Sequence, residues 1–158
     1  MAISRKIFHQ LNKLRGSRVL ILGIGNVLKS DDGAGSVLCR QLSGKVRAEI
    51  IDAGTVPENY IQPVIDKAPK NLLIVDAVDF KALPGTVQIF KPEQLNSLIT
   101  STHSLSPRIF IDMIAGEIDV AVYFIGIQPA KTSFGQALSV EVSCVVQQLS
   151  ALFISLLA

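Results

Sequence analysis

Unbroken apolar runs alternate with stretches of helical periodicity along most of this chain. An unbroken run of this kind is typical of a strand that is buried on both faces of a sheet. Strands are therefore expected over residues 18–24, 46–51, 71–75, 86–90 and 120–127. Helices are expected over residues 34–42, 60–67, 107–115 and 138–157, with a helical turn or two over 92–98.

This alternation predicts an α/β fold, a three-layer α/β/α sandwich around a five-stranded, mostly parallel twisted sheet. Only about ten residues separate the third and fourth strands, whereas a parallel crossover needs a dozen or more. The fourth strand, residues 86–90, is therefore expected to run antiparallel near an edge. Because no linker or internal repeat interrupts the pattern, we expect one domain over residues 1–158.

Both ends of the chain invite a second interpretation. Residues 1–16 are basic and free of acids, as in a transit peptide, but their apolar residues recur at helical spacing. We therefore expect an N-terminal helical extension that packs on the domain. Residues 138–157 are apolar enough for a membrane span, but Glu141 and two glutamines interrupt them. A long helix buried against the sheet is expected instead, without membrane insertion.

Composition and charge exclude several functional classes. Hydrophobic residues make up 49% of the chain and charged residues 18%, which argues against disorder. The net charge of +2 and the absence of a Lys/Arg run argue against nucleic-acid binding. Cys39 and Cys144 lie far apart without a CxxC motif, so both are expected to be small core residues in a reducing cytoplasm.

The segment Gly23–Gly35, GIGNVLKSDDGAG, joins the first strand to the first helix. Residues 30–32 carry helix-capping chemistry at that junction. Asp52 and Asp76 end the second and third strands, and a polar loop with His103 precedes the helix over 107–115. Because ligands bind beyond the carboxyl ends of parallel strands, these side chains are expected to collect at one rim.

Two interpretations of this rim need no metal. The pair Gly23 and Gly25, together with Asp52, resembles a dinucleotide-binding fingerprint, but the third glycine is missing. Asp31 and Asp32 would also repel a pyrophosphate at the helix start. Alternatively, each aspartate is an ordinary helix cap that contributes about 1 kcal/mol.

A metal site built from Asp32, Asp76 and His103 is the third interpretation. Two carboxylates about 5 Å apart repel by roughly 3 kcal/mol at an effective dielectric near 20, more than a helix dipole of about 0.3–1 kcal/mol offsets. A cation resolves this repulsion, and the resulting O,O,N ligand set suits zinc or nickel. The other histidine, His9, falls in the N-terminal helix, and neither a GxSxG nor an HExxH motif is present.

Five motifs occur in order between Val19 and Pro129: GIGNVLKSDDGAG, DAGTVPEN, LLIVDAVD, STHSLS and FIGIQP. Together they resemble the hydrogenase maturation endopeptidases, especially those of the hydrogenase 3 type. The resemblance implies an aspartyl-type or metal-dependent endopeptidase, and the isolated cysteines indicate that it acts in the cytoplasm. Its substrate would be the [NiFe]-hydrogenase large-subunit precursor, whose C-terminal extension is removed after nickel insertion.

The resemblance also implies roles for individual residues. Asp32, Asp76 and His103 would be both metal ligands and catalytic residues, with the nickel presented by the precursor rather than held permanently. Asp31 is left with capping or support of Asp32. The flexible loops after the first two strands would line a peptide cleft through Gly25, Asn26, Gly54, Thr55, Glu58 and Asn59.

Three other functions remain open from the sequence. One is an NAD-dependent oxidoreductase with a Rossmann-like domain, and another is a metal-binding maturation chaperone that does not cleave its partner. The third is a related peptidase acting on another precursor, such as a homologue of the spore protease.

Overall fold

The computed structural model describes residues 3–100, 105–135 and 137–158. In this part of the chain, six strands form one sheet in the order β2-β1-β3-β6-β4, with a short β5 paired to β3. The strands are β1 (Val19–Ile24), β2 (Glu49–Gly54), β3 (Asn71–Asp79), β4 (Val87–Phe90), β5 (Ile99–Thr100) and β6 (Ala121–Ile127). The α-helices are α1 (Arg5–Asn12), α2 (Ala34–Leu42), α3 (Ile61–Lys67), α4 (Pro107–Ala115) and α5 (Val140–Leu157). Short 3-10 helices are η1 (Ser30–Gly33), η2 (Pro57–Tyr60) and η3 (Pro92–Ser97).

Strand directions confirm the expected mostly parallel sheet. β1, β2, β3 and β6 pair in parallel, and β4 pairs antiparallel with β6 at the end of the strand order. The short connection between β3 and β4 therefore produces the predicted antiparallel edge strand. The sequence analysis missed β5, whose two residues pair antiparallel with Val78 and Asp79.

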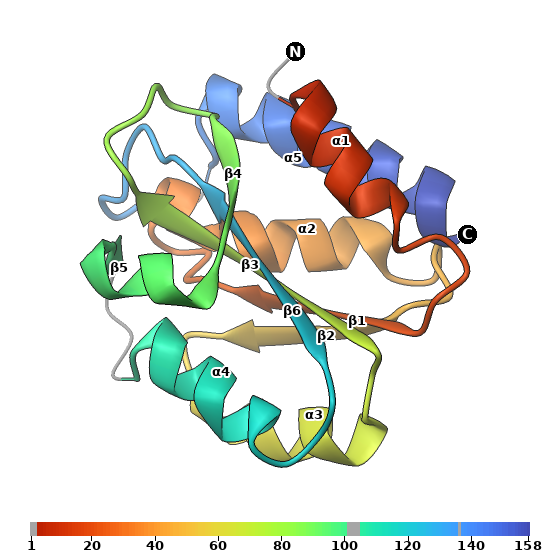
Figure 1. Cartoon of the computed structure of the whole chain (residues 1–158). Coiled ribbons are helices and arrows are strands. Elements are labelled where there is room, and N and C mark those ends of the chain that lie inside the picture. Colours follow the sequence, from red (N-terminus) through yellow and green to blue (C-terminus); the bar gives the residue numbers. More distant parts are fainter. Residues whose placement is uncertain (1–2, 101–104, 136) are drawn as a thin grey trace.

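Alternating side chains of the central strands bury both faces of the sheet. Val19 and Ile21 of β1 point into the core beneath α1, α2 and α5, whereas Leu20 and Leu22 point into the core beneath α3 and α4. Figure 1 shows these two groups of helices on opposite faces of the sheet. The three-layer prediction is confirmed, and double-sided burial explains why the strand sequences show no polar alternation.

The two terminal helices share one of these cores. Ile7 and Leu11 of α1 lie in the same buried cluster as Val145, Val146 and Phe153 of α5. The predicted N-terminal helix is thus present, and its first turn is capped by the Ser4 hydroxyl, which accepts from the Ile7 N–H at 3.2 Å. By length and composition α5 is the one described helix that could cross a membrane. Its packing against α1, α2 and the sheet gives its apolar residues a role in the core.

Three local expectations are wrong. Ser30–Asp32 do not cap α2: they form η1, and the N-cap of α2 is Gly33, without a side-chain hydrogen bond. The second strand begins at Glu49 rather than at residue 46, because its pairing with β1 begins opposite Leu20. Cys144 is exposed on the outer side of α5, whereas Cys39 is buried as expected.

Candidate active site at the carboxyl ends of β1 and β3

The strand order places a crevice between β1 and β3. From these central strands the sheet extends to β2 on one side and to β6 on the other, so the connections diverge at their carboxyl ends. Asp32 follows β1 through the loop before α2. Asp76 lies within β3, one residue beyond the pairing of Val75 with Gly23 of β1, because β3 runs on to Asp79. Both carboxylate side chains have 0% exposure.

The loop after β1 holds the Asp32 carboxylate in place. The Asn26 backbone N–H donates to Asp32 Oδ2 at 3.1 Å, and the Asn26 side chain accepts from the Leu28 N–H at 3.0 Å. A Cβ at Gly25 would lie 2.1 Å from the Asp32 carbonyl oxygen, so only glycine fits there. The glycine and the asparagine predicted to line a peptide cleft therefore also shape the Asp32 loop.

The loop after β2 lies directly beside this one. The Gly25 N–H donates to the Gly54 carbonyl at 2.8 Å, and Gly54 has a φ of +57°, a left-handed conformation that favours glycine. Thr55 and Asn59 are exposed, and Glu58 is half-buried. The stretch expected to be an open loop includes η2, which begins at Pro57. The structure thus brings the two predicted cleft segments together at the rim.

Asp76 borders a very small hollow of about 10 Å³. Ile24, Pro57 and Leu105 line it, so both loops and the start of the α4 segment converge on this carboxylate. His103 lies outside the described residues, and its predicted place beside Asp32 and Asp76 is therefore not tested. Within the described ranges, no three His, Cys, Asp or Glu side chains gather closely enough to hold a metal ion.

Asp31 has a role that the sequence analysis missed. Its buried carboxylate accepts hydrogen bonds from the Ala130 N–H (2.9 Å), the Lys131 N–H (3.2 Å), and the Ser139 N–H (2.7 Å) and hydroxyl (2.8 Å). Ser139 in turn caps α5. Asp31 therefore joins η1 to the segment between β6 and α5. The capping expected of it is wrong, because its partners lie about a hundred residues further along the chain.

A second clamp holds the other side of the same segment. The buried Gln128 side chain accepts from the Phe80 N–H at 2.8 Å and the Ala82 N–H at 3.2 Å, and donates to Asp79 at 3.2 Å. Hydrogen bonds from Lys81 and Gln128 lower the pKa of the Asp79 carboxyl. In the sequence, the only sign of these contacts is the single glutamine that follows the apolar strand in the FIGIQP motif.

The remaining polar groups argue against dinucleotide binding and thiol chemistry. Asp52 accepts from the Ser36 hydroxyl at 2.6 Å and from the Gly54 N–H at 3.3 Å, so its carboxylate holds β2 against α2. Buried Asp31 and Asp32 occupy the approach to α2 where a pyrophosphate would bind. Burial, and the nearby Asp52 charge, raise the pKa of the Cys39 thiol to about 12, which excludes it as a thiolate nucleophile near neutral pH.

Several known maturation proteases share this sequence pattern and fold. The family model described as hydrogenase maturation protease matches residues 35–156. The Hydrogenase 3 maturation protease of Escherichia coli K12 is 34% identical over 118 residues, covering 73% of this chain and 75% of that protein.

Solved structures agree with this match. The [NiFe] hydrogenase maturation protease HycI from Thermococcus kodakarensis superposes with a TM-score of 0.85 at 27% identity, covering 93% of this chain and 97% of that one. The solution structure of the E. coli endopeptidase HycI gives a TM-score of 0.79 at 30% identity, covering 87% and 90%. The chain is therefore a peptidase that belongs to the hydrogenase maturation protease family.

Proposed function

We propose that this peptidase removes the C-terminal extension of a [NiFe]-hydrogenase large-subunit precursor, and that nickel already held by the precursor directs the cut. The observation that carries the proposal is the pair of fully buried carboxylates, Asp32 of η1 and Asp76 of β3. Two carboxylates buried near each other repel, and carboxylate oxygens are ligands for divalent cations. A metal that arrives with the substrate would bind to this pair when cleavage is due.

His103 completes the proposed ligand set, because an imidazole beside two carboxylates suits nickel. The described residues on either side of it support this assignment. Thr100 pairs with Val78, two residues beyond Asp76, and Leu105 lines the same hollow as Asp76. The chain therefore enters and leaves residues 101–104 beside the carboxylate that His103 is proposed to join.

The chain's own residues prepare the site for this substrate. The Asn26 N–H orients the Asp32 carboxylate before the precursor arrives, which lowers the reorganisation needed on binding. Nickel held by the precursor would polarise the scissile carbonyl or activate a water. Asp76 and His103 are the groups proposed to carry the proton, and Asp31 holds η1 while they do so.

The rim around the site offers surface for a protein substrate. The extension would lie along Gly25 and Asn26 on one side and the segment 54–59 on the other. Exposed apolar side chains flank these loops: Val56 is 41% exposed, Leu28 52% and Phe134 82%. Exposed apolar groups at a site commonly contact a protein partner. Two free cysteines are compatible with a reducing cytoplasm as the place of this reaction.

The two histidines of the chain provide a matched test. His103→Ala and His9→Ala would each be incubated with nickel-loaded precursor, and the released peptide would be measured by mass spectrometry. We expect His103→Ala to lose at least about 100-fold in rate, since loss of even an outer-shell partner of a metal site costs about 10–100-fold. His9→Ala, on the exposed side of α1, should cleave at the normal rate. Full activity of His103→Ala would contradict the proposed ligand set.

A further inference from the structure

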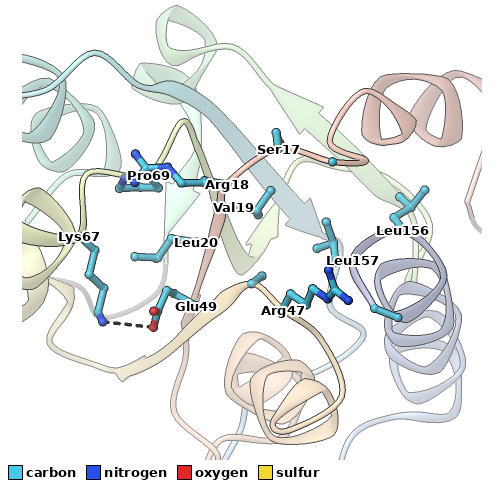
Figure 2. Close-up of a pocket in the computed structure, with 13 residues that line it drawn as sticks. Ser17, Arg18, Val19, Leu20, Arg47, Glu49, Lys67, Pro69, Leu156 and Leu157 are labelled. Carbon is cyan, nitrogen blue, oxygen red and sulfur yellow. Dashed lines mark hydrogen bonds and ion pairs between the residues drawn. The ribbon is translucent and has the colours of Figure 1, made fainter.

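A second cavity lies at the opposite end of the sheet from Asp32 and Asp76. Its volume is about 540 Å³, within the range of about 300–1,000 Å³ typical of small-molecule sites. The starts of β1 and β2, the residues just before β3 and the end of α5 surround it (Figure 2). Ligands of open α/β sheets usually bind at the carboxyl ends of the strands, so fold alone does not explain this cavity.

Positive charge exceeds negative charge in the walls of the cavity. Arg18, Arg47 and Lys67 line it together with Glu49 and with Ala158, the last residue, which carries a backbone carboxylate. Lys67 Nζ pairs with Glu49 at 3.1 Å, which leaves two guanidinium groups against one carboxylate. Figure 2 shows Arg18 and Lys67 on one side of the cavity and Arg47 on the other.

Contacts within the fold hold these walls in place. The Arg18 guanidinium donates to the Ala68 carbonyl, which uses part of its five-donor capacity and orients the group beside Pro69. The Arg47 N–H donates to the Leu157 carbonyl at 2.8 Å, so the start of β2 is tied to the end of α5. Because the Arg18 guanidinium is already held, it loses less side-chain freedom when it binds an anion.

The rest of the lining is aliphatic. Val19, Leu20, Leu156 and Leu157 are buried and form apolar surface between the two arginines. The described lining contains no aromatic ring, so the cavity offers no platform on which a nucleobase would stack. This combination suits a short aliphatic body that carries an acidic group at each end.

We propose that this cavity binds a small organic dianion, with one acidic group on Arg18 and the other on Arg47. Carboxylates and phosphates both accept paired hydrogen bonds from a guanidinium, so either acid fits the chemistry. The site is independent of the peptidase centre, because none of its lining residues belongs to the loops around Asp32 and Asp76.

Titration of the full chain at low ionic strength, followed by NMR of backbone amides, tests this site. The probes are glutarate, a dicarboxylate, and 3-phosphoglycerate, which carries a phosphate and a carboxylate. Butyrate has one charge and glutaramide has none, and these two serve as ligand controls. We expect saturable shifts at residues 17–20, 47–49 and 156–158 with at least one dianion, with a Kd of about 1 mM or tighter. Which dianion binds more tightly identifies the second acidic group.

Single substitutions distinguish the cavity from general attraction of anions to a basic protein. Arg47→Gln and Arg18→Gln should each weaken binding about tenfold. Arg5→Gln, an equal charge change at an exposed position of α1, should leave it within about twofold. Arg47→Gln keeps its backbone bond to Leu157, so folding is retained for this variant. Equal binding of butyrate or glutaramide, no saturable shift with either dianion, or equal affinity of the Arg47→Gln and Arg5→Gln variants would overturn the proposal.

Discussion

The two ends of the sheet use charge in opposite ways. At the carboxyl ends, Asp31, Asp32 and Asp76 are fully buried, and the carboxylate of Asp31 is surrounded by backbone donors. At the amino ends, Arg18 and Arg47 are exposed around an open cavity. Buried charges must be compensated in the folded protein, whereas exposed charges keep most of their hydration. The net charge of +2 does not reveal that buried acidic groups lie at one end of the sheet and exposed basic groups at the other.

The largest effect expected at the acidic end is on catalysis. Asp32→Asn removes the negative charge proposed to meet nickel and retains the shape of the side chain. Metal-centred charge stabilisation contributes several kcal/mol to such reactions, so the cleavage rate should fall roughly 1,000-fold. Rates measured with nickel-loaded precursor provide the test, with unchanged thermal unfolding as the sign that the fold is intact. Cleavage within about tenfold of the unmodified rate would remove Asp32 from the ligand set.

The adjacent residue separates structure from chemistry. The Asp31 carboxylate accepts four hydrogen bonds through its two oxygens. Asp31→Asn replaces one of these oxygens with an NH2 group, which cannot accept from the N–H or hydroxyl donors that face it. We expect a loss of roughly 3 kcal/mol in the free energy of unfolding, since bonds to a charged group contribute about 1.5–3 kcal/mol each. In a chain of this size, that corresponds to a fall in Tm of about 10 °C.

Differential scanning calorimetry of the two variants compares them directly. Asp31→Asn should unfold earlier than Asp32→Asn, while retaining more activity at low temperature. The reverse order of stabilities would contradict the role of Asp31 as the link between η1 and the segment before α5.

The sequence predicted some helix and strand bounds more accurately than others. The bounds of α2 and α4 were predicted to the residue. Ser106 and Pro107 set the start of α4, whereas α2 begins after Gly33 without the side-chain cap that was expected. The antiparallel edge strand followed from connection length. The start of β2 was wrong, because strand ends are set by the neighbouring strand rather than by the local sequence.

The candidate site was predictable in place but not in its internal bonding. The topology rule brought Asp32 and Asp76 to one rim, and the structure has Asp32 in η1, which contacts β3, and Asp76 within β3. No local pattern indicates that Asp31 bonds to Ser139, because that contact depends on how the whole sheet assembles. The position of His103 stays a prediction.

The buried thiol of Cys39 should make the free energy of unfolding depend on pH. Burial raises the pKa of its thiol to about 12 from an ordinary 9.0, so the unfolded chain loses this proton at lower pH than the folded chain. Its contribution is therefore fully present below pH 9.0 and is lost as the pH rises toward 12. By pH 10 the free energy of unfolding should fall by about 1 kcal/mol. Cys39→Ala should lack this dependence, and exposed Cys144→Ala should retain it.

The smallest effect is expected at the basic end. Glu49→Gln removes the ion pair with Lys67, whose side chains are 60% and 42% exposed respectively. Exposed pairs contribute little, so the free energy of unfolding should change by less than about 0.5 kcal/mol. Urea unfolding of Glu49→Gln beside Asp31→Asn sharpens the comparison between the two ends. If Glu49→Gln lowered the free energy of unfolding as much as Asp31→Asn, solvent would not be screening the Glu49–Lys67 ion pair as described.

Cleavage of nickel-loaded and nickel-free precursor by the unmodified protein tests the central claim most directly. Both precursors would be prepared from the same large subunit, incubated at equal concentration, and analysed for the released C-terminal peptide by mass spectrometry. If the acidic centre acts on nickel that the precursor carries, only the nickel-loaded form should be cut. Equal cutting of both forms would contradict the account.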